Sequence, residues 1–234
     1  MNLTAMTYNI CSGRNMQRER NIDFAASVIR EVQPDFVTIN EVRVNTSDVQ
    51  VNQADELGRL AGYYPVFGKS IDILGGEYGN AFLTRWPLVE WKVVQIPDRR
   101  SEEKASYEHR TVLRCVIEKN GKRLTVLGSH FGLAKVEHDS AVETVMGILE
   151  KEENPVILMG DFNMTPDNPK LQPVFAAMHD TANYTDDIKT FSSEDPKIKI
   201  DYILYTDPLK ADSLRTIDTQ NSDHRPLVAE FTLD

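Results

Sequence analysis

The 234-residue chain, with 41% hydrophobic and 26% charged residues, has the length and composition of one folded globular domain over residues 1–234. Its net charge of −10 argues against a protein that holds long nucleic acid through backbone electrostatics, because such binding needs basic surfaces. Its apolar runs are strand-sized and its two cysteines, Cys11 and Cys115, make no disulfide framework, so we expect a monomeric cytoplasmic protein without a membrane span or secretory signal.

The first half of the chain alternates strand-like and helix-like patterns. An apolar stripe before Pro34 recurs every three or four residues, which is typical of a helix that the proline ends. The pattern predicts strands over Leu3–Ile10, Asp35–Val42, Gly79–Trp86 and Leu88–Ile96 and helices over Glu19–Gln33 and Ala54–Ala61. The charged stretch Pro97–His109 is predicted to be a solvated loop.

The second half contains the clearest hairpin. Asn120-Gly121 separates two strand patterns, Arg110–Lys119 and Lys122–Phe131, and favours a tight antiparallel turn. Helices follow around Val142–Leu149 and over Leu171–Met178, and strands over Pro155–Gly160, Lys199–Tyr205 and Pro226–Leu233. Because strands outnumber helices and hairpins mix with crossovers, we expect an α/β (α+β) fold of two packed sheets with helices on the outer faces.

Polar residues stand at the ends of many of these apolar runs. Asp223-His224 precedes the last strand and places a carboxylate beside an imidazole, a pair that can bind a metal and hold a phosphate. Alone it would indicate only a capped turn. Similar positions are held by Asn9, Glu41, His130, Asp161, Asn163 and Asp201. Polar strand ends that converge on one rim of a sheet commonly form a hydrolytic site.

Two alternative sites fail on their own requirements. The segment Gly160–Asp167 spaces its oxygens like a calcium loop, but Pro166 and Gln172 occupy the positions of the required glycine and glutamate. In Gly128–Gly132, His130 stands where a serine nucleophile would be needed. Carboxylates, amides and imidazoles without such a nucleophile indicate direct attack by water, aided by Mg²⁺ or Mn²⁺. Phosphoester hydrolysis matches this set of groups.

Seven segments taken in order resemble the successive signatures of the endonuclease/exonuclease/phosphatase superfamily. They run from the first strand to the last: TYNI, PDFVTINEV, GGEYGNAFLTRWPL, GSHFGL, GDFNMTP, KIDYIL and SDHRPLVAEF. The superfamily includes pancreatic deoxyribonuclease, abasic-site nucleases, neutral sphingomyelinases and inositol polyphosphate 5-phosphatases. The resemblance implies a four-layer sandwich of two mixed β-sheets flanked by helices, with the active site at one edge.

The resemblance also implies a role for each polar strand end. Glu41 would be the principal magnesium ligand, with Asn9 and Asp223 in or near the coordination shell. Asp161 would orient or deprotonate the water, Asn163 would donate to the phosphoryl oxygens, and Asp201 would pair with His224, which stabilises the phosphate together with His130. The resemblance leaves open whether Asp161 or His224 is the base. Asn80 and Arg110 are expected to bind substrate, with a structural role as the alternative.

The predicted function is a magnesium-dependent phosphoesterase, with a phosphodiesterase favoured over a phosphomonoesterase, that acts on a small or lipid-like phosphoester or on a nucleic-acid end. A DNA-repair or degradative nuclease is the alternative with the same chemistry, and a catalytically silent binding module is the alternative from another class. The chain departs from the common family motifs at Asn40, where a glutamine often precedes the metal-binding glutamate. It also departs at Ser129 and Phe131, which flank His130 in place of the frequent threonine and leucine. We expect these changes to affect substrate fit more than chemistry.

Overall fold

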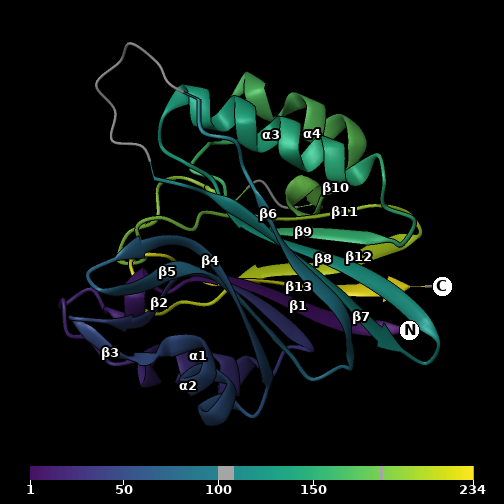
Figure 1. Ribbon diagram of the computed structural model, residues 1–234. Coiled ribbons are helices and arrows are strands. Elements are labelled where there is room, and N and C mark those ends of the chain that lie inside the picture. Colours follow the sequence, from purple (N-terminus) through teal and green to yellow (C-terminus); the bar gives the residue numbers. More distant parts are fainter. Residues whose placement is uncertain (100–107, 185–186, 234) are drawn as a thin grey trace.

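A computed structural model of the protein describes residues 1–99, 108–184 and 187–233. Two mixed β-sheets pack face to face, and helices cover both outer sides (Figure 1). This arrangement confirms the predicted fold class. Most of the predicted solvated loop, Pro97–His109, lies outside the described residues. No helix in the described ranges is both long enough and apolar enough to cross a bilayer.

The first sheet has the strand order β12-β13-β1-β2-β5-β4, with β3 paired to β2. Strand β1 runs parallel to β2 and antiparallel to β13, so the chain's last strand pairs with its first. The strands are β1 (Asn2–Asn9), β2 (Phe36–Thr46), β3 (Val49–Asn52), β4 (Tyr64–Ile73), β5 (Gly76–Thr84), β12 (Leu209–Thr216) and β13 (Leu227–Leu233).

The second sheet has the order β10-β11-β9-β8-β7-β6. Strands β7 and β8 form the hairpin predicted at Asn120-Gly121, and β8 then pairs with β9 in parallel through a crossover. The strands are β6 (Leu88–Gln95), β7 (Thr111–Lys119), β8 (Lys122–His130), β9 (Val156–Asp161), β10 (His179–Asp180) and β11 (Asp201–Tyr205).

Three hydrophobic clusters correspond to the three contacts between the four layers. One lies between the sheets and includes Phe36, Phe82 and Phe231. A second packs the first sheet against α1 (Asp23–Val32) and α2 (Gln53–Ala61), and the third packs the second sheet against α3 (Lys135–Leu149) and α4 (Gln172–Ala177). Short 3₁₀ turns lie at Cys11–Gly13, Pro169–Leu171 and Thr181–Tyr184.

The four strands that sequence patterns missed, β3, β4, β10 and β12, lie at sheet edges or pair at one side only. An edge strand has one face or one side in water, so its apolar alternation is weak. Pro65 within β4 also argues against a strand, although an edge position tolerates it because one side of the strand needs no hydrogen bonds.

Two predicted helices were too long at their starts. The first begins at Asp23, because residues 14–20 form a tight turn in which Arg14 and Arg20 pair and Arg18 is left-handed. The helix predicted over Leu171–Met178 begins as the 3₁₀ turn at Pro169 and is α-helical only over Gln172–Ala177. Pro169 and Pro173 each lie in the first turn of their element, where a missing amide hydrogen breaks no intrahelical bond.

Candidate active site

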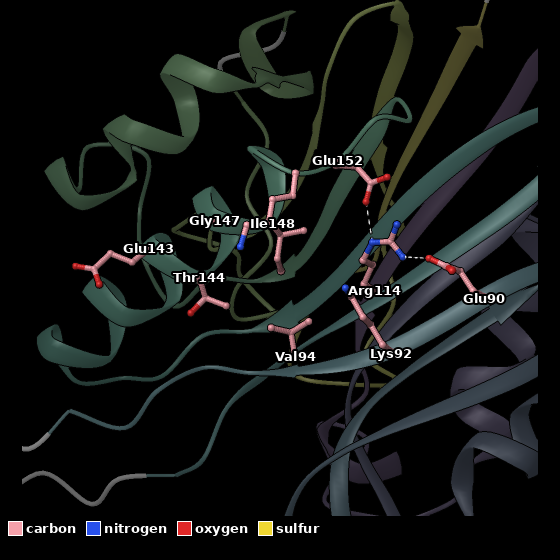
Figure 2. Close-up of a pocket in the computed structure, with 10 residues that line it drawn as sticks. Glu90, Lys92, Val94, Arg114, Glu143, Thr144, Gly147, Ile148 and Glu152 are labelled. Carbon is pink, nitrogen blue, oxygen red and sulfur yellow. Dashed lines mark hydrogen bonds and ion pairs between the residues drawn. The ribbon is translucent and has the colours of Figure 1, made fainter.

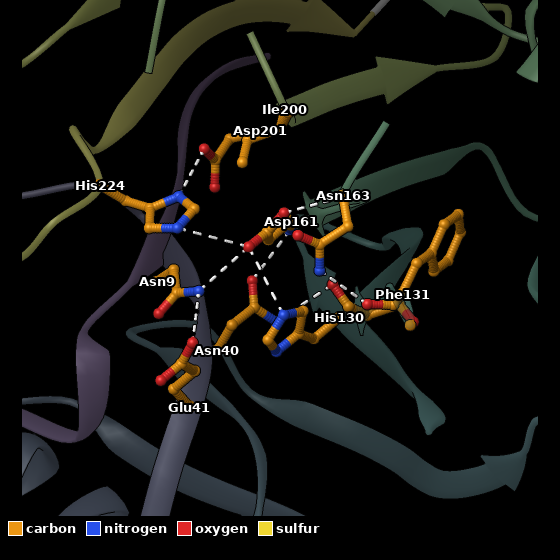
Figure 3. A network of polar contacts seen from close by, with 12 residues as sticks. Asn9, Asn40, Glu41, His130, Phe131, Asp161, Asn163, Ile200, Asp201 and His224 are labelled. Carbon is orange, nitrogen blue, oxygen red and sulfur yellow. Dashed lines mark hydrogen bonds and ion pairs between the residues drawn. The ribbon is translucent and has the colours of Figure 1, made fainter. Parts of the chain in front are cut away.

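The predicted site residues come together at one edge because of strand direction. The parallel pairs β1–β2 and β8–β9 each bring two carboxyl ends to the same edge of a sheet. Strand β11 runs antiparallel to β9 with Asp201 directly opposite Asp161, so β11 starts where β9 ends. The loop before β13 delivers His224 to the same edge (Figure 3).

Strand alternation aims these side chains between the sheets. In β9, Ile157 and Met159 lie in the cluster between the sheets, and Asp161 continues their row. The next residue points the other way. Phe131, Phe162 and Tyr202, which follow His130, Asp161 and Asp201, stack with ring centroids 4.4 and 4.8 Å apart on the helix-covered face. This aromatic stack anchors the three strand ends that carry the site.

Two backbone features give the site its shape. A bulge in β2 between Ile39 and Val42 includes Glu41, whose φ is +62°. The bulge lets the consecutive residues Asn40 and Glu41 both take part in the polar network at the sheet edge. At Gly160 φ is +145°, and an added Cβ would lie 1.8 Å from the Ser129 carbonyl oxygen. Only glycine allows β9 to approach β8 this closely just before Asp161.

Asp161 is the centre of the polar network (Figure 3). Asn9 Nδ2 donates to Asp161 Oδ2 and to Glu41 Oε1, both at 3.1 Å. The Nε2 atoms of His130 and His224 each lie 3.5 Å from the same Asp161 oxygen. Burial raises the pKa of Asp161 to about 7, against the opposing effect of the nearby His224. One carboxylate oxygen is therefore surrounded by three nitrogen groups in a water-poor setting.

His224 and Asp201 form a buried ion pair. His224 Nδ1 lies 2.9 Å from Asp201 Oδ2, and the two side chains are 6% and 1% exposed. Burial alone would lower the pKa of His224, but the carboxylates of Asp201 and Asp161 outweigh it and raise the pKa to about 10. The imidazole is thus held in its charged form at neutral pH.

Two groups of side chains are candidates for holding a cation. The ligand atoms of Asp161, Asp201 and His224 lie within 4.8 Å of one another. Here the imidazolium already supplies positive charge, and a protonated imidazole cannot coordinate a metal. The second group is Glu41 with Asp223. Burial raises the pKa of Glu41, and the negative charge of Asp223 adds to that effect. This pair has the oxygen donors and the excess negative charge that suit a hard divalent ion.

The remaining predicted residues surround this network. Asn163, left-handed at φ +50°, donates from its backbone nitrogen to Asp161 Oδ1 at 2.9 Å and from Nδ2 to the Phe131 carbonyl at 2.9 Å. His130 Nδ1 and Arg110 Nε are buried without a hydrogen-bond partner. Arg110 also pairs with Glu108 at 3.1 Å, and its charge offsets part of the rise that burial causes in the pKa of Glu41. Arg110 Nε is a buried donor that an anionic ligand would satisfy. His130 Nδ1 would donate only in the tautomer that leaves Nε2 without a hydrogen, because burial lowers the pKa of His130 and keeps the ring neutral.

Asn80 lies beside the site, but protein groups already bind its amide. Its Oδ1 accepts from Asn40 at 2.8 Å and its Nδ2 donates to the Thr111 carbonyl at 3.4 Å. Sequence reasoning also gave no role to Asn40 itself or to Ser222, whose hydroxyl donates to the Asn9 carbonyl at 2.7 Å. A signal existed for Asn40, because an amide inside an apolar strand must find buried partners.

A well-formed cavity of about 390 Å³ lies elsewhere, between α3 and the strands β6 and β7 (Figure 2). Its lining includes none of the predicted site residues. Arg114 in this cavity is already paired with Glu90 and Glu152. The site at the sheet edge is therefore assigned from its chemistry and not from the depth of a cavity.

Comparisons with known proteins agree with this architecture. Similar solved structures include an endonuclease/exonuclease/phosphatase protein from Beutenbergia cavernae (TM-score 0.85, 23% identity, covering 99% of this chain and 72% of that one). They also include a mannosyl-6-phosphatase from Bacteroides thetaiotaomicron (TM-score 0.80, 17% identity, 99% and 100% covered). A third is ANGEL2, a 2',3'-cyclic phosphatase (TM-score 0.75, 13% identity, 99% and 95% covered).

At these identities the likeness shows the fold alone. No curated protein matched the chain. The sequence profile of the Endonuclease/Exonuclease/phosphatase family, however, matches residues 6–224, which is nearly the whole chain. The protein therefore belongs to the endonuclease/exonuclease/phosphatase family, whose members are hydrolases that act on phosphoester bonds.

Proposed function

We propose that this protein is a magnesium-dependent phosphodiesterase in which water attacks phosphorus directly. The observation that carries the proposal is the setting of Asp161. Its carboxylate is 1% exposed, and its Oδ2 lies 3.1 Å from the Asn9 amide and 3.5 Å from both histidines. A buried carboxylate with a raised pKa, held at a sheet edge among phosphate-binding groups, suits the activation of water.

We assign Asp161, and not His224, as the general base. A base must be unprotonated when the water arrives, and His224 is kept charged by Asp201 and Asp161. The charged imidazole suits a different task, which is to stabilise negative charge on the phosphoryl oxygens. Asp201 holds the ring through Nδ1, so that Nε2 faces Asp161 and the reaction site.

Glu41 and Asp223 would hold the magnesium ion, with the Asn9 amide beside them. When bound, the ion would neutralise charge on the phosphoryl group and its leaving oxygen. Asn9 also donates to Glu41 and Asp161 together, so one amide fixes the two carboxylates relative to each other. Manganese offers similar oxygen preference and would substitute.

His130, Asn163 and Arg110 would surround the phosphate. The unpartnered Arg110 Nε supplies a buried donor, His130 would donate from the one ring nitrogen that carries its hydrogen, and Asn163 keeps one Nδ2 hydrogen free of its bond to Phe131. For Asn80 we propose a positioning role in place of a substrate contact, since it is 3% exposed and its amide bonds to Asn40 and Thr111.

Small or lipid-like phosphodiesters are the proposed substrate class. The net charge of −10 disfavours the binding of long duplex DNA, so a nuclease is only the second candidate. Relatives in this fold include a mannosyl-6-phosphatase and a 2',3'-cyclic phosphatase, so both sugar phosphates and cyclic nucleotide phosphates belong in a substrate panel. A silent binding module is disfavoured because three carboxylates and two histidines lie in one polar network (Figure 3), namely Glu41, Asp161, Asp201, His130 and His224.

The test is hydrolysis of a panel of phosphodiesters, phosphomonoesters, sphingomyelin and nucleic acids with magnesium. We expect turnover of a small diester, lost in Asp161→Asn and retained in Asp35→Asn. Asp35 is a matched control, because it is a hydrogen-bonded aspartate at the opposite end of β2. Turnover that survives both Asp161→Asn and chelation of magnesium would contradict the proposal.

A further inference from the structure

The amide of Asn40 joins the two sheets directly beneath the site. Asn40 belongs to β2 of the first sheet and is fully buried. Its Oδ1 accepts from the backbone nitrogen of Asp161 at 3.0 Å, and its Nδ2 donates to the Ser129 carbonyl at 3.1 Å, both in the second sheet. The residue that precedes Glu41 therefore holds the backbone of Asp161.

The orientation of this amide follows from its fixed partners. A backbone N–H can only donate and a carbonyl oxygen can only accept, so the Asn40 oxygen must face Asp161 and its nitrogen must face Ser129. The second Nδ2 hydrogen goes to Asn80 Oδ1 at 2.8 Å. The oxygen of Asn40 and both of its Nδ2 hydrogens therefore bond to protein groups, and neither hydrogen is free for a ligand.

Asn80 completes the arrangement from β5. It is 3% exposed, and its own Nδ2 donates to the Thr111 carbonyl of β7 at 3.4 Å, while Ser129 Oγ donates to the same carbonyl at 2.9 Å. Asn40 therefore holds β8 and β9 of the second sheet, and Asn80 holds β7. The two residues form a buried clamp between the sheets.

This clamp matters because the reacting groups come from different sheets. Glu41 follows Asn40 in the first sheet, whereas Asp161 ends β9 in the second. We propose that Asn40 and Asn80 are positioning residues that fix the Asp161 carboxylate relative to Glu41. On this proposal the residue at the position of the common glutamine would affect chemistry as well as substrate fit. The inference rests on the proposed function for its kinetic test only.

The kinetic test compares Asn40→Leu, which keeps the size of the side chain, with Asn80→Ala. For Asn40→Leu we expect kcat to fall about 10- to 100-fold, with KM and the magnesium requirement nearly unchanged, because a buried hydrogen bond to the base's backbone is lost. Asn80→Ala should lower kcat less, and the double variant should be little worse than Asn40→Leu. A raised KM with unchanged kcat in Asn80→Ala would instead show a substrate contact and overturn its positioning role.

The second test needs no activity. Because the Asp161 amide hydrogen is bonded to the Asn40 side chain, its exchange with solvent deuterium should accelerate at least about 10-fold in Asn40→Leu, while the β9 amides of Ile157 and Met159 stay protected. Thr38→Val is the matched control, since Thr38 lies two residues away on the same strand and donates only to Thr7 Oγ1, at 3.0 Å. It should leave the Asp161 amide unchanged.

The outcomes separate this inference from the proposed function. If the wild-type protein hydrolyses nothing but the Asp161 amide responds selectively to Asn40→Leu, the proposed function fails and the clamp stands. If Asn40→Leu does not fold, Asn80→Ala is measured by the same exchange experiment, with a smaller acceleration expected at Asp161. An Asp161 amide that exchanges at the wild-type rate in a folded Asn40 or Asn80 variant, or only as fast as in Thr38→Val, overturns the inference.

Discussion

The buried pair of Asp201 and His224 gives the most demanding prediction, because its partners should act as one unit. Their atoms Oδ2 and Nδ1 are 2.9 Å apart, and neither side chain is more than 6% exposed. Removing one partner of such a pair leaves an uncompensated buried group, which costs up to about 3–5 kcal/mol of folding stability. Asp161, at 3.5 Å from His224, would compensate part of this loss in Asp201→Asn.

Effects on rate should be large and should overlap. Loss of a positioned charged imidazole is expected to lower kcat/KM by roughly 10²- to 10⁴-fold in His224→Ala, and Asp201→Asn should cost a similar or smaller factor. Because the carboxylate acts through the ring, the double variant should lie within about 10-fold of His224→Ala. Steady-state hydrolysis of the best panel substrate at saturating magnesium measures all three.

A matched surface pair provides the control. His179 Nε2 and Asp207 Oδ1 lie 3.4 Å apart, but these side chains are 55% and 89% exposed. Their substitution should leave the rate unchanged and shift stability by less than about 1 kcal/mol. Rate losses of Asp201→Asn and His224→Ala that multiply fully in the double variant would refute the cooperative role.

Three further predictions concern metal, salt and thiols. Chelation should abolish turnover, and Glu41→Ala should raise the magnesium concentration for half-maximal rate at least about 10-fold, because a charged ligand is lost. An unchanged titration would remove Glu41 from the metal site. Turnover of the small substrate should fall less than about 10-fold between low and physiological salt, with plasmid DNA a poor substrate, since a small ester offers few phosphate contacts; efficient plasmid cleavage with steep salt dependence would favour the nuclease. Cys115 should react with a thiol reagent only after unfolding, because it is buried and burial raises its pKa. Burial, together with the negative charges of Asp223 and Glu41, raises the pKa of Cys11 to about 12, so Cys11 should react slowly. Rapid labelling of both thiols in the native protein would contradict these expectations.

Much of the fold follows from patterns that the sequence displays. Central strands such as β1 and β9 are buried on both faces and give continuous apolar runs, so they could be predicted. Edge strands such as β4 and β12 could not be predicted, because buried and exposed residues are mixed along them and they carry prolines or charges. The pairing of β13 with β1 joins the two ends of the sequence, and no local pattern encodes such a contact.

The gathering of these polar side chains at one sheet edge was predictable, but the bonds among them were not. Asp161, Asn163 and His224 stand in recognisable segments at strand ends, and the structure brings them together. Their roles remain predictions until tested. The bond from Asn40 to the Asp161 amide spans 121 positions in the chain, so its existence depends on how the two sheets meet. Asn80 illustrates the same limit, because sequence reasoning could not show that its amide is already occupied.

The central claim is that water activated at Asp161 attacks phosphorus directly. The most direct measurement is a single hydrolysis of the best phosphodiester substrate in ¹⁸O-labelled water with magnesium, followed by mass analysis of both products. We predict one labelled oxygen in the phosphate-bearing product and none in the alcohol, with label incorporation lost in Asp161→Asn although magnesium still binds. Label in the alcohol, or full incorporation in Asp161→Asn, would contradict the account.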